Sequence, residues 1–362
     1  MLGPDFDGDG TADLVVAQAG YAIPASAGAC DGPGVYVIPG GTRGDARVPV
    51  TDVATFRLDR DHCFGAALAT APDLDGDGIA ELLVTEPSSY GHDYEADVYM
   101  VTSRAVAAGG TTSDVATTFV DARVVARQGD LDGDGVDDLV LASDTAWWAV
   151  SGATIPMGTV EAPTERVPAA ESQGYGSTGD LDGDGLAEVA TVSGAGAIAV
   201  VSPADGTDAW VEITGAAFGP PRGFDVDGDG YRDVVAEAGA VYVVPVYARG
   251  GNIPASEATT ILAPVGTQPT IVDMAVTDEG LVVSARTAAD AESVQAVIAW
   301  EDLGPGSVDL SVARGCVRTD GFLGPHTVAG SYLGNGTLQV ALGAADLGGY
   351  VLDLAAATEA CD

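Results

Sequence analysis

Five copies of one acidic nine-residue motif, Asp-x-Asp-Gly-Asp-Gly-x-x-Asp/Glu, organise this chain of 362 residues. The copies begin at Asp5, Asp73, Asp130, Asp180 and Asp225, so their starts lie 68, 57, 50 and 45 residues apart. Each copy places a carboxylate at positions 1, 3, 5 and 9. Such closely spaced negative charges repel one another unless a cation lies among them. The motif therefore predicts a cation site and a structural repeat.

The motif suits Ca²⁺, a hard cation that takes about six to eight oxygen ligands in flexible geometry. Positions 4 and 6 are glycine in every copy, and glycine accepts the positive φ angles that let the backbone curl around an ion. Position 7 varies, as expected if it offers only its carbonyl oxygen, and position 9 is expected to close the shell as a bidentate carboxylate. The predicted ligands are Asp5, Asp7, Asp9, Thr11 and Asp13; Asp73, Asp75, Asp77, Ile79 and Glu81; Asp130, Asp132, Asp134, Val136 and Asp138; Asp180, Asp182, Asp184, Leu186 and Glu188; and Asp225, Asp227, Asp229, Tyr231 and Asp233.

The first half of the motif is shared with the EF-hand, which needs a bidentate Glu at position 12 and a following helix. Position 12 is an aliphatic residue or threonine in all five copies, and the segments after the motif are β-branched and apolar. Such segments predict strands, so the motif is expected to be a loop between two strands. Two alternatives remain: Mg²⁺, which prefers a more rigid octahedron, and acidic turns that hold no metal.

The net charge of −40 limits the class of partner. Positions 1, 3, 5 and 9 of the five motifs supply 20 of the 54 acidic residues, and five Ca²⁺ ions would bring the formal charge to about −30. Neither nucleic acid nor an anionic membrane surface is expected to bind, because no basic patch is present to meet phosphates. The chain also lacks a run of about 20 apolar residues, so no membrane insertion is predicted.

The four cysteines, Cys30, Cys63, Cys316 and Cys361, indicate an oxidising compartment. Four cysteines allow three pairings, and we favour Cys30–Cys63 and Cys316–Cys361, with four buried free thiols as the alternative. Together with structural Ca²⁺ sites, this favours an extracellular or cell-surface location. The first residues have no apolar signal-peptide core, so we expect a mature chain from which a signal has been removed.

A repeat of about 40 to 50 residues is typical of one four-stranded propeller blade. Each motif is followed by a strand, a turn and a second strand; the predicted second strands span residues 35–38, 98–101, 147–150, 198–201 and 241–244. Two further units keep the strands at 281–283 and 296–298, and at 338–342 and 350–352, but have lost the acids. Five units with ligands and two without make seven, and no helical periodicity is apparent.

The chain resembles the FG-GAP repeat family, the seven-bladed propeller of integrin α subunits and many bacterial surface proteins. The second unit carries the resemblance best, with Phe64-Gly65-Ala66-Ala67 before the motif and Leu82-Leu83-Val84-Thr85-Glu86-Pro87 after it. The resemblance implies an all-β, seven-bladed β-propeller of four-stranded antiparallel blades, with Ca²⁺ loops joining the first and second strands of five blades. The expected blades of this single domain span 1–58, 59–120, 121–166, 167–215, 216–263, 264–314 and 315–362. Only four residues precede Asp5, so a C-terminal segment is expected to complete the first blade, unless its first strand is missing.

No catalytic constellation is recognisable around the three histidines, so we do not expect an enzyme. About five structural Ca²⁺ ions are the expected cofactors, and a monomer is expected. Two long loops, at 20–34 and 87–97, are expected to lie side by side and to bind an unidentified protein or glycan through Tyr21, Tyr90, His92 and Tyr94. We therefore expect a non-catalytic extracellular adhesion or matrix-binding module. The alternatives are a lectin-like propeller and an accessory domain of a secreted enzyme.

Overall fold

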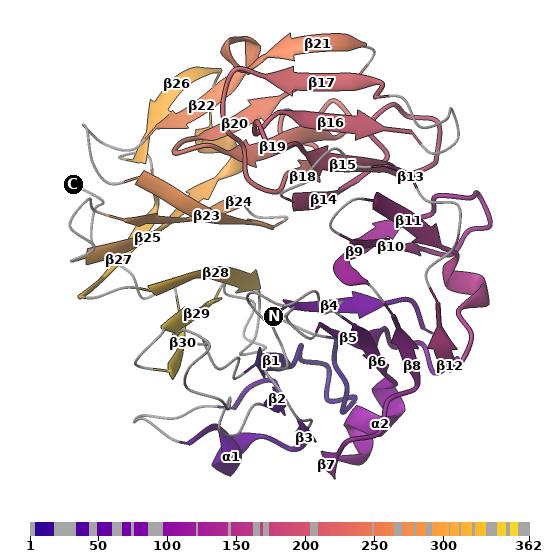
Figure 1. The fold of residues 1–362 in the computed structure, drawn as a ribbon. Helices are drawn as coiled ribbons and strands as arrows, with labels where there is room; N and C mark the ends of the chain where they lie inside the picture. The colour runs from indigo at the N-terminus through magenta and orange to yellow at the C-terminus, as the bar shows by residue number, and fades with distance from the viewer. Residues whose placement is uncertain are drawn as a thin grey trace, which may run out of the picture. The chain divides into compact units, whose positions relative to one another are not determined.

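The computed structural model describes residues 4–17, 34–42, 49–59, 67–73, 76–85, 97–120, 122–143, 146–161, 167–168, 174–202, 209–247, 250–263, 270–277, 280–286, 292–303, 305–310, 313–320, 323–330, 339–344 and 348–353. The chain divides into two compact units, one of residues 1–169 with 332–335, and one of residues 170–331 with 336–362. Each unit is built from small β-sheets that follow one another along the chain (Figure 1).

The first unit contains three sheets, in the orders β1-β2-β3-β7, β12-β8-β6-β5-β4 and β13-β11-β10-β9. Its strands are β1 (Leu14–Ala17), β2 (Gly34–Ile38), β3 (Phe56–Asp59), β4 (Ala67–Ala71), β5 (Glu81–Thr85), β6 (Val98–Val101), β7 (Gly110–Thr112), β8 (Thr117–Phe119), β9 (Arg123–Gly129), β10 (Asp138–Ala142), β11 (Ala146–Val150), β12 (Gly158–Val160) and β13 (Val167–Pro168). Two short helices, α1 (Val50–Val53) and α2 (Ser103–Ala108), and a 3₁₀ turn at Gly152–Thr154 connect them.

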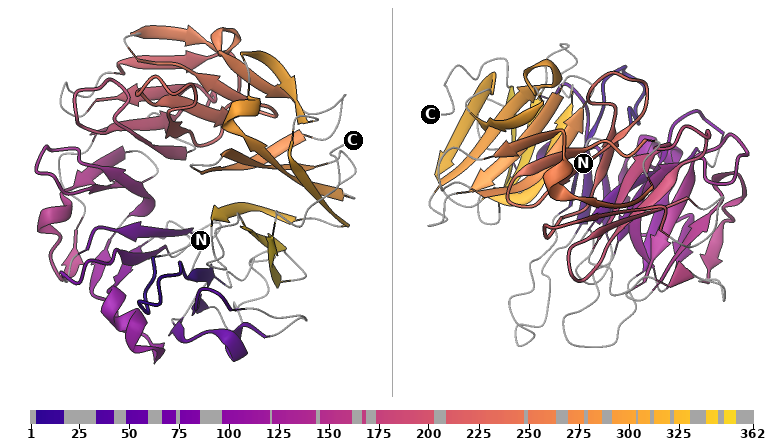
Figure 2. Two further views of the ribbon diagram at one scale, coloured as in Figure 1. Left: turned by 180° about the vertical axis from the view of Figure 1, so that it is seen from behind. Right: turned by 90° about the horizontal axis from the view of Figure 1, so that it is seen from above.

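The second unit contains four sheets, in the orders β14-β15-β16-β17-β21, β18-β19-β20-β22-β26, β23-β24-β25-β27 and β28-β29-β30. Its strands are β14 (Gly174–Gly179), β15 (Glu188–Val192), β16 (Ile198–Val201), β17 (Val211–Thr214), β18 (Arg222–Phe224), β19 (Asp233–Glu237), β20 (Val241–Val244), β21 (Gly251–Pro254), β22 (Thr260–Ala263), β23 (Thr270–Thr277), β24 (Gly280–Arg286), β25 (Glu292–Ala299), β26 (Gly306–Asp309), β27 (Gly315–Asp320), β28 (Leu323–Gly330), β29 (Gln339–Ala344) and β30 (Gly348–Asp353). Further 3₁₀ turns lie at Ala255–Glu257 and Trp300–Asp302. Figure 2 shows the same strands from two other directions.

The middle strands of these sheets are buried on both faces, which explains their continuous apolar runs. All five residues of β5 are buried. Side chains alternate along a strand, so Leu82 and Val84 join a core cluster with β2 and β3, whereas Leu83 joins another with β10 and β11. The same alternation buries the consecutive Trp147 and Trp148, each 4% exposed. Burial of both faces is what positions each loop at the end of a rigid hairpin.

Short parallel strands at the sheet edges were not predicted. β7, β12, β21 and β26 pair in parallel with β3, β8, β17 and β22, respectively. β7, for example, follows β6 of the second sheet along the chain but adds an edge to the first sheet. These strands cover edges that would otherwise expose unpaired backbone groups. The sheets are therefore mainly, but not entirely, antiparallel.

Two strands begin past the expected limits of the blades to which their sheets correspond. β13 pairs with β11 of the third sheet although it begins past the expected limit at residue 166. β27 pairs with β25 of the sixth sheet although it begins past the expected limit at residue 314. α2 was not expected either; it is capped by the side chain of Thr102 at its start and ended by Gly109. The cysteine pairings remain predictions, because Cys30, Cys63, Cys361 and the side chain of Cys316 lie outside the described residues.

Candidate metal centres

Four of the five acidic motifs lie where the resemblance placed them, in a loop that joins two antiparallel strands: β4 to β5, β9 to β10, β14 to β15 and β18 to β19. The first loop leads directly into β1. The motif therefore ends at the same point of the sheet each time, with its ninth residue beside or at the start of a buried strand.

The two glycines of every motif do what their positions predict. All ten have positive φ angles between 75° and 93°. Their N–H groups donate to the two carboxylate oxygens of the first Asp, at 2.7 and 2.6 Å for Gly8 and Gly10 on Asp5. The other four motifs repeat both bonds, at 2.6–3.0 Å. The backbone thus wraps around the first carboxylate.

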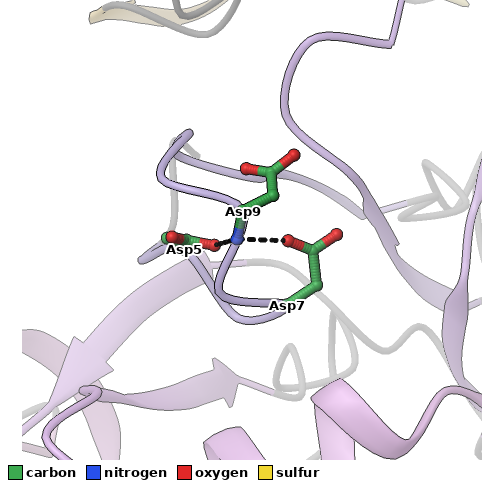
Figure 3. A group of neighbouring side chains, drawn as sticks. All are labelled: Asp5, Asp7 and Asp9. Atoms are coloured by element: carbon green, nitrogen blue, oxygen red, sulfur yellow. Dashed lines mark hydrogen bonds between the residues drawn. The ribbon is translucent and has the colours of Figure 1, made fainter.

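The acids at positions 3 and 5 are held in the same way. The N–H of position 7 donates to the acid at position 5 in all five motifs, at 2.8–2.9 Å. The N–H of position 5 donates to the acid at position 3 in the four motifs where that acid is described, at 3.0–3.1 Å. Figure 3 shows Asp5, Asp7 and Asp9 of the first motif gathered in this way. Asp75 lies outside the described residues.

The carboxylate oxygens are close enough together to share one Ca²⁺. In each of four motifs, oxygens from three acids lie within 4.8 Å of one another; the groups are Asp5, Asp7 and Asp9; Asp130, Asp132 and Asp138; Asp180, Asp182 and Glu188; and Asp225, Asp227 and Asp229. Oxygens that each lie about 2.3–2.6 Å from one ion can be no more than about 5 Å apart. The donor set is all oxygen, so the residues fit a hard dication.

The ninth acid has a second structural role that the sequence did not reveal. It is buried in every motif, with exposures of 0–6%. In the four motifs whose position 2 is described, one of its oxygens accepts the N–H of that residue, as from Phe6 to Asp13 at 2.8 Å. In the first and third sheets, the other oxygen accepts an N–H from a residue that follows the next strand, β2 or β11: from Gly40 to Asp13 and from Gly152 to Asp138, both at 2.8 Å. In these sheets the ninth acid ties the loop to the next turn.

Burial makes these ninth acids hard to ionise. It raises the pKa of Asp13 and Asp138, and the like charges of the neighbouring acids act in the same direction, while the backbone N–H donors lower it. The pKa of Glu188 rises to about 8 and that of Asp233 to about 7, again chiefly through burial. A cation between the acids would favour their charged forms.

Two serines that the sequence did not single out also reach the acids at position 5. Ser103 Oγ donates to Asp77 Oδ2 at 2.9 Å, and Ser151 Oγ donates to Asp134 Oδ2 at 3.3 Å. Ser103 lies just after β6 and Ser151 just after β11, the strands that follow β5 and β10 in their sheets. A small polar residue just after that strand is the signal that could have identified them.

The predicted ligand-binding residues are not tested by these observations. Tyr21, Tyr90, His92 and Tyr94 lie outside the described residues. A different aromatic pair is described, in which Tyr231 and Tyr247 stack with ring centroids 3.3 Å apart. Tyr247 is 37% exposed. Among the described residues, no helix is long and apolar enough to cross a membrane.

Comparisons with known proteins agree with this architecture. The FG-GAP repeat model matches residues 64–99, which contain the second motif with β4, β5 and the start of β6. The structure of BBS1N in complex with ARL6DN is 12% identical over 97% of this chain and 90% of that chain, with a TM-score of 0.55. The Dos1 propeller (8% identity, 89% of this chain and 74% of that chain, TM-score 0.49) and the C-terminal WD40 domain of Sif2 (13%, 90% and 78%, 0.47) are also similar. No curated protein sequence matches. At 12% identity the likeness to the BBS1N structure shows the fold alone, and it confirms the predicted all-β propeller.

Proposed function

We propose that this chain, an all-β propeller with an FG-GAP repeat at residues 64–99, is a non-catalytic, Ca²⁺-stabilised module that binds a protein partner outside the cell. The observation that carries the proposal is the recurrence of one loop geometry. In all five motifs, backbone N–H groups hold the acids at positions 1 and 5, and in four motifs oxygens from three acids lie within 4.8 Å of one another. Backbone dipoles orient carboxylates but do not neutralise them, so a dication is the natural partner.

The ions would act on stability rather than on chemistry. Each would be held by the acids at positions 1, 3, 5 and 9 of one loop, and would offset the repulsion among them. That loop fixes the register of its hairpin, since the ninth acid begins or adjoins the buried second strand. Low-affinity structural Ca²⁺ sites of this kind suit an extracellular setting, where Ca²⁺ is abundant.

The test of metal binding is calorimetric. Protein stripped with EDTA should bind about five Ca²⁺ ions, and its melting temperature should rise with Ca²⁺ far more than with the same concentration of Mg²⁺. Mg²⁺ is the matched control, because it demands a smaller octahedral shell. An unchanged melting curve in excess EDTA, with no heat of Ca²⁺ binding, would overturn the proposal.

Protein binding is proposed from the fold and the sequence. Propellers commonly bind proteins, and the similar BBS1N structure is itself a complex with ARL6DN. We assign the contact to the loops at 20–34 and 87–97, where Tyr21, Tyr90, His92 and Tyr94 occur. Capture of a partner from a surface fraction should be lost in the double variant Tyr90→Ala/Tyr94→Ala and kept in Tyr247→Ala. Equal capture by both variants would place the contact elsewhere.

A carbohydrate ligand is the second candidate, and one observation favours it. The exposed Tyr247, stacked on Tyr231, offers an aromatic face of the kind on which sugar rings pack. Binding on a glycan array that disappears in Tyr247→Ala would support this function. Glycan binding that survives the substitution would remove the reason for it.

A further inference from the structure

In every sheet with a motif, the ninth acid lies opposite the residue that follows the next strand of the sheet. In the second sheet Leu82 pairs with Val101, so Glu81 lies opposite Thr102; in the third, Leu139 pairs with Val150, so Asp138 lies opposite Ser151. In the first three sheets, the next residue in the sequence donates its N–H to the ninth acid. The donors are Gly40 to Asp13, Ser103 to Glu81 and Gly152 to Asp138. In the first three sheets this residue supplies a backbone donor.

The fourth sheet keeps the register but not the donor. Val189 pairs with Val201, so Glu188 lies opposite Ser202. The next residue in the sequence is Pro203, which lies outside the described residues; a proline has no backbone N–H in any conformation. The N–H of Leu181 donates to Glu188 Oε2 at 2.5 Å. Glu188 Oε1 is buried without a hydrogen-bond partner.

An unpartnered carboxylate oxygen is costly at this place. Glu188 is 0% exposed, so bulk solvent does not reach this oxygen. The hydroxyl of Ser202, also buried, is likewise without a partner. Leaving a buried polar atom unpaired costs about 1–3 kcal/mol, and more for a charged group. The fourth loop therefore needs a partner for Glu188 more than the first and third loops do for their ninth acids.

The fifth sheet provides an internal comparison. Asp233 lies opposite Pro245, because Val234 pairs with Val244. Within the described residues, the N–H of Val226 is the backbone donor to Asp233. Asp233 is 6% exposed, however, and neither of its oxygens is among the buried atoms without a partner. Loss of the second donor alone does not leave a buried carboxylate oxygen without a partner; the acid must also be completely buried.

We propose that the fourth loop is the controlling Ca²⁺ site of this protein, the one that fills first and whose ion Glu188 binds with the oxygen that lacks an N–H donor. This inference rests on the proposed function. One oxygen each of Asp180, Asp182 and Glu188 already lie within 4.8 Å of one another, so the ion would meet the ninth acid together with the first and third. In the first and third loops the ninth acid gives both oxygens to backbone donors. Those loops gain less from an ion, because both oxygens of the ninth acid already have a donor there.

The order of filling can be read directly by hydrogen exchange on the full chain. EDTA-stripped protein receives Ca²⁺ in steps of one equivalent, and mass spectrometry follows the amides of β15 and β10. The first equivalent should slow exchange in β15 at least tenfold while β10 is little changed. If β10 or β1 is protected first, the inference fails while the proposed Ca²⁺ sites stand. If no strand gains protection and no Ca²⁺ binds, the proposed function fails as well.

Two variants separate the roles of the ninth acid. Glu188→Gln keeps the shape but carries an amide that can donate toward Asp180 and Asp182, so it should weaken the tightest Ca²⁺ event at least tenfold while leaving the melting temperature in EDTA equal or higher. Asp138→Asn is the matched control, in which an amide NH₂ must face a backbone N–H. It should lower the melting temperature in EDTA and leave the tightest event unchanged. A lower melting temperature in EDTA for Glu188→Gln, or loss of the tightest event in Asp138→Asn, would overturn the inference.

Discussion

A pair of glycines in the fourth loop should respond unequally to the same substitution. Gly183 and Gly185 have φ angles of 83° and 92° and both donate to Asp180, at 2.6 and 3.0 Å. Alanine at either position forces a left-handed conformation that costs about 1–2 kcal/mol. A Cβ on Gly185 meets nothing within 4 Å, whereas a Cβ on Gly183 would lie 2.8 Å from Cε1 of Tyr231.

The extra cost at Gly183 comes from the neighbouring loop. The ring of Tyr231 is stacked on Tyr247, so it must slide to admit the Cβ. Overpacking of this kind typically costs about 1–3 kcal/mol. We therefore expect Gly185→Ala to destabilise the metal-free protein by about 1–2 kcal/mol and Gly183→Ala by about 2–5 kcal/mol.

Urea unfolding in EDTA measures this difference without a contribution from bound metal. A double-mutant cycle then assigns it: Tyr231→Ala should remove the excess cost of Gly183→Ala and should be additive with Gly185→Ala. Equal costs for the two glycine variants, or additivity in both cycles, would refute the contact between the fourth and fifth loops. A positive result would show that Tyr231 of the fifth loop packs against the fourth loop.

Three further predictions follow from the loops and the cysteines. Ser103→Ala removes the hydrogen bond to Asp77 Oδ2 and should cost about 1 kcal/mol in urea unfolding with a few-fold weaker Ca²⁺ binding at the second loop, whereas Ser103→Thr should retain most of both. In EDTA the folded protein binds a proton at Glu188 more tightly than the unfolded chain, so stability should fall as the pH rises from about 4.5 to about 8; saturating Ca²⁺ should abolish or reverse this slope. A flat pH profile in EDTA would contradict the burial of that group. Thiol titration of the denatured, unreduced protein should detect no free cysteine if the four are paired, and four if they are buried thiols.

Much of the fold could be predicted because its signals are local. The segments after each loop are apolar over only four or five residues, as strands buried on both faces must be, and β6 and β16 match the predicted residues 98–101 and 198–201. The edge strands could not be predicted in this way. β7 reads Gly-Thr-Thr and β12 reads Gly-Thr-Val, too short and too polar to show a period. They form because a neighbouring sheet offers an unpaired edge.

In the candidate site, too, the contacts within the motif could be predicted from the sequence and the contact between strands could not. The ten glycines and the acids at positions 1, 3 and 5 act within a few residues of one another, and their arrangement followed from the motif alone. The ninth acid acts across the hairpin, as in the bond from Gly40 to Asp13, 27 residues away in the chain. The motif is the same whether the distant donor is present or missing. Only the register of the strands shows that the ninth acid lies opposite Pro39 in one sheet, with Gly40 next in the sequence, and opposite Ser202 in another, with Pro203 next in the sequence.

This division explains how five near-identical loops can differ in their need for an ion. The glycine N–H groups hold the first acid in the same way in every loop. What then separates the loops is the state of the ninth acid without metal. Both oxygens of Asp138 accept N–H groups, so an ion there stabilises the loop only by reducing the repulsion among its acids. One oxygen of Glu188 has no donor, so an ion there also removes the free-energy cost of an unpaired buried atom. The same substitution to an amide should therefore be harmful without metal in the third loop and harmless in the fourth, although the two motifs differ at position 9 by one methylene.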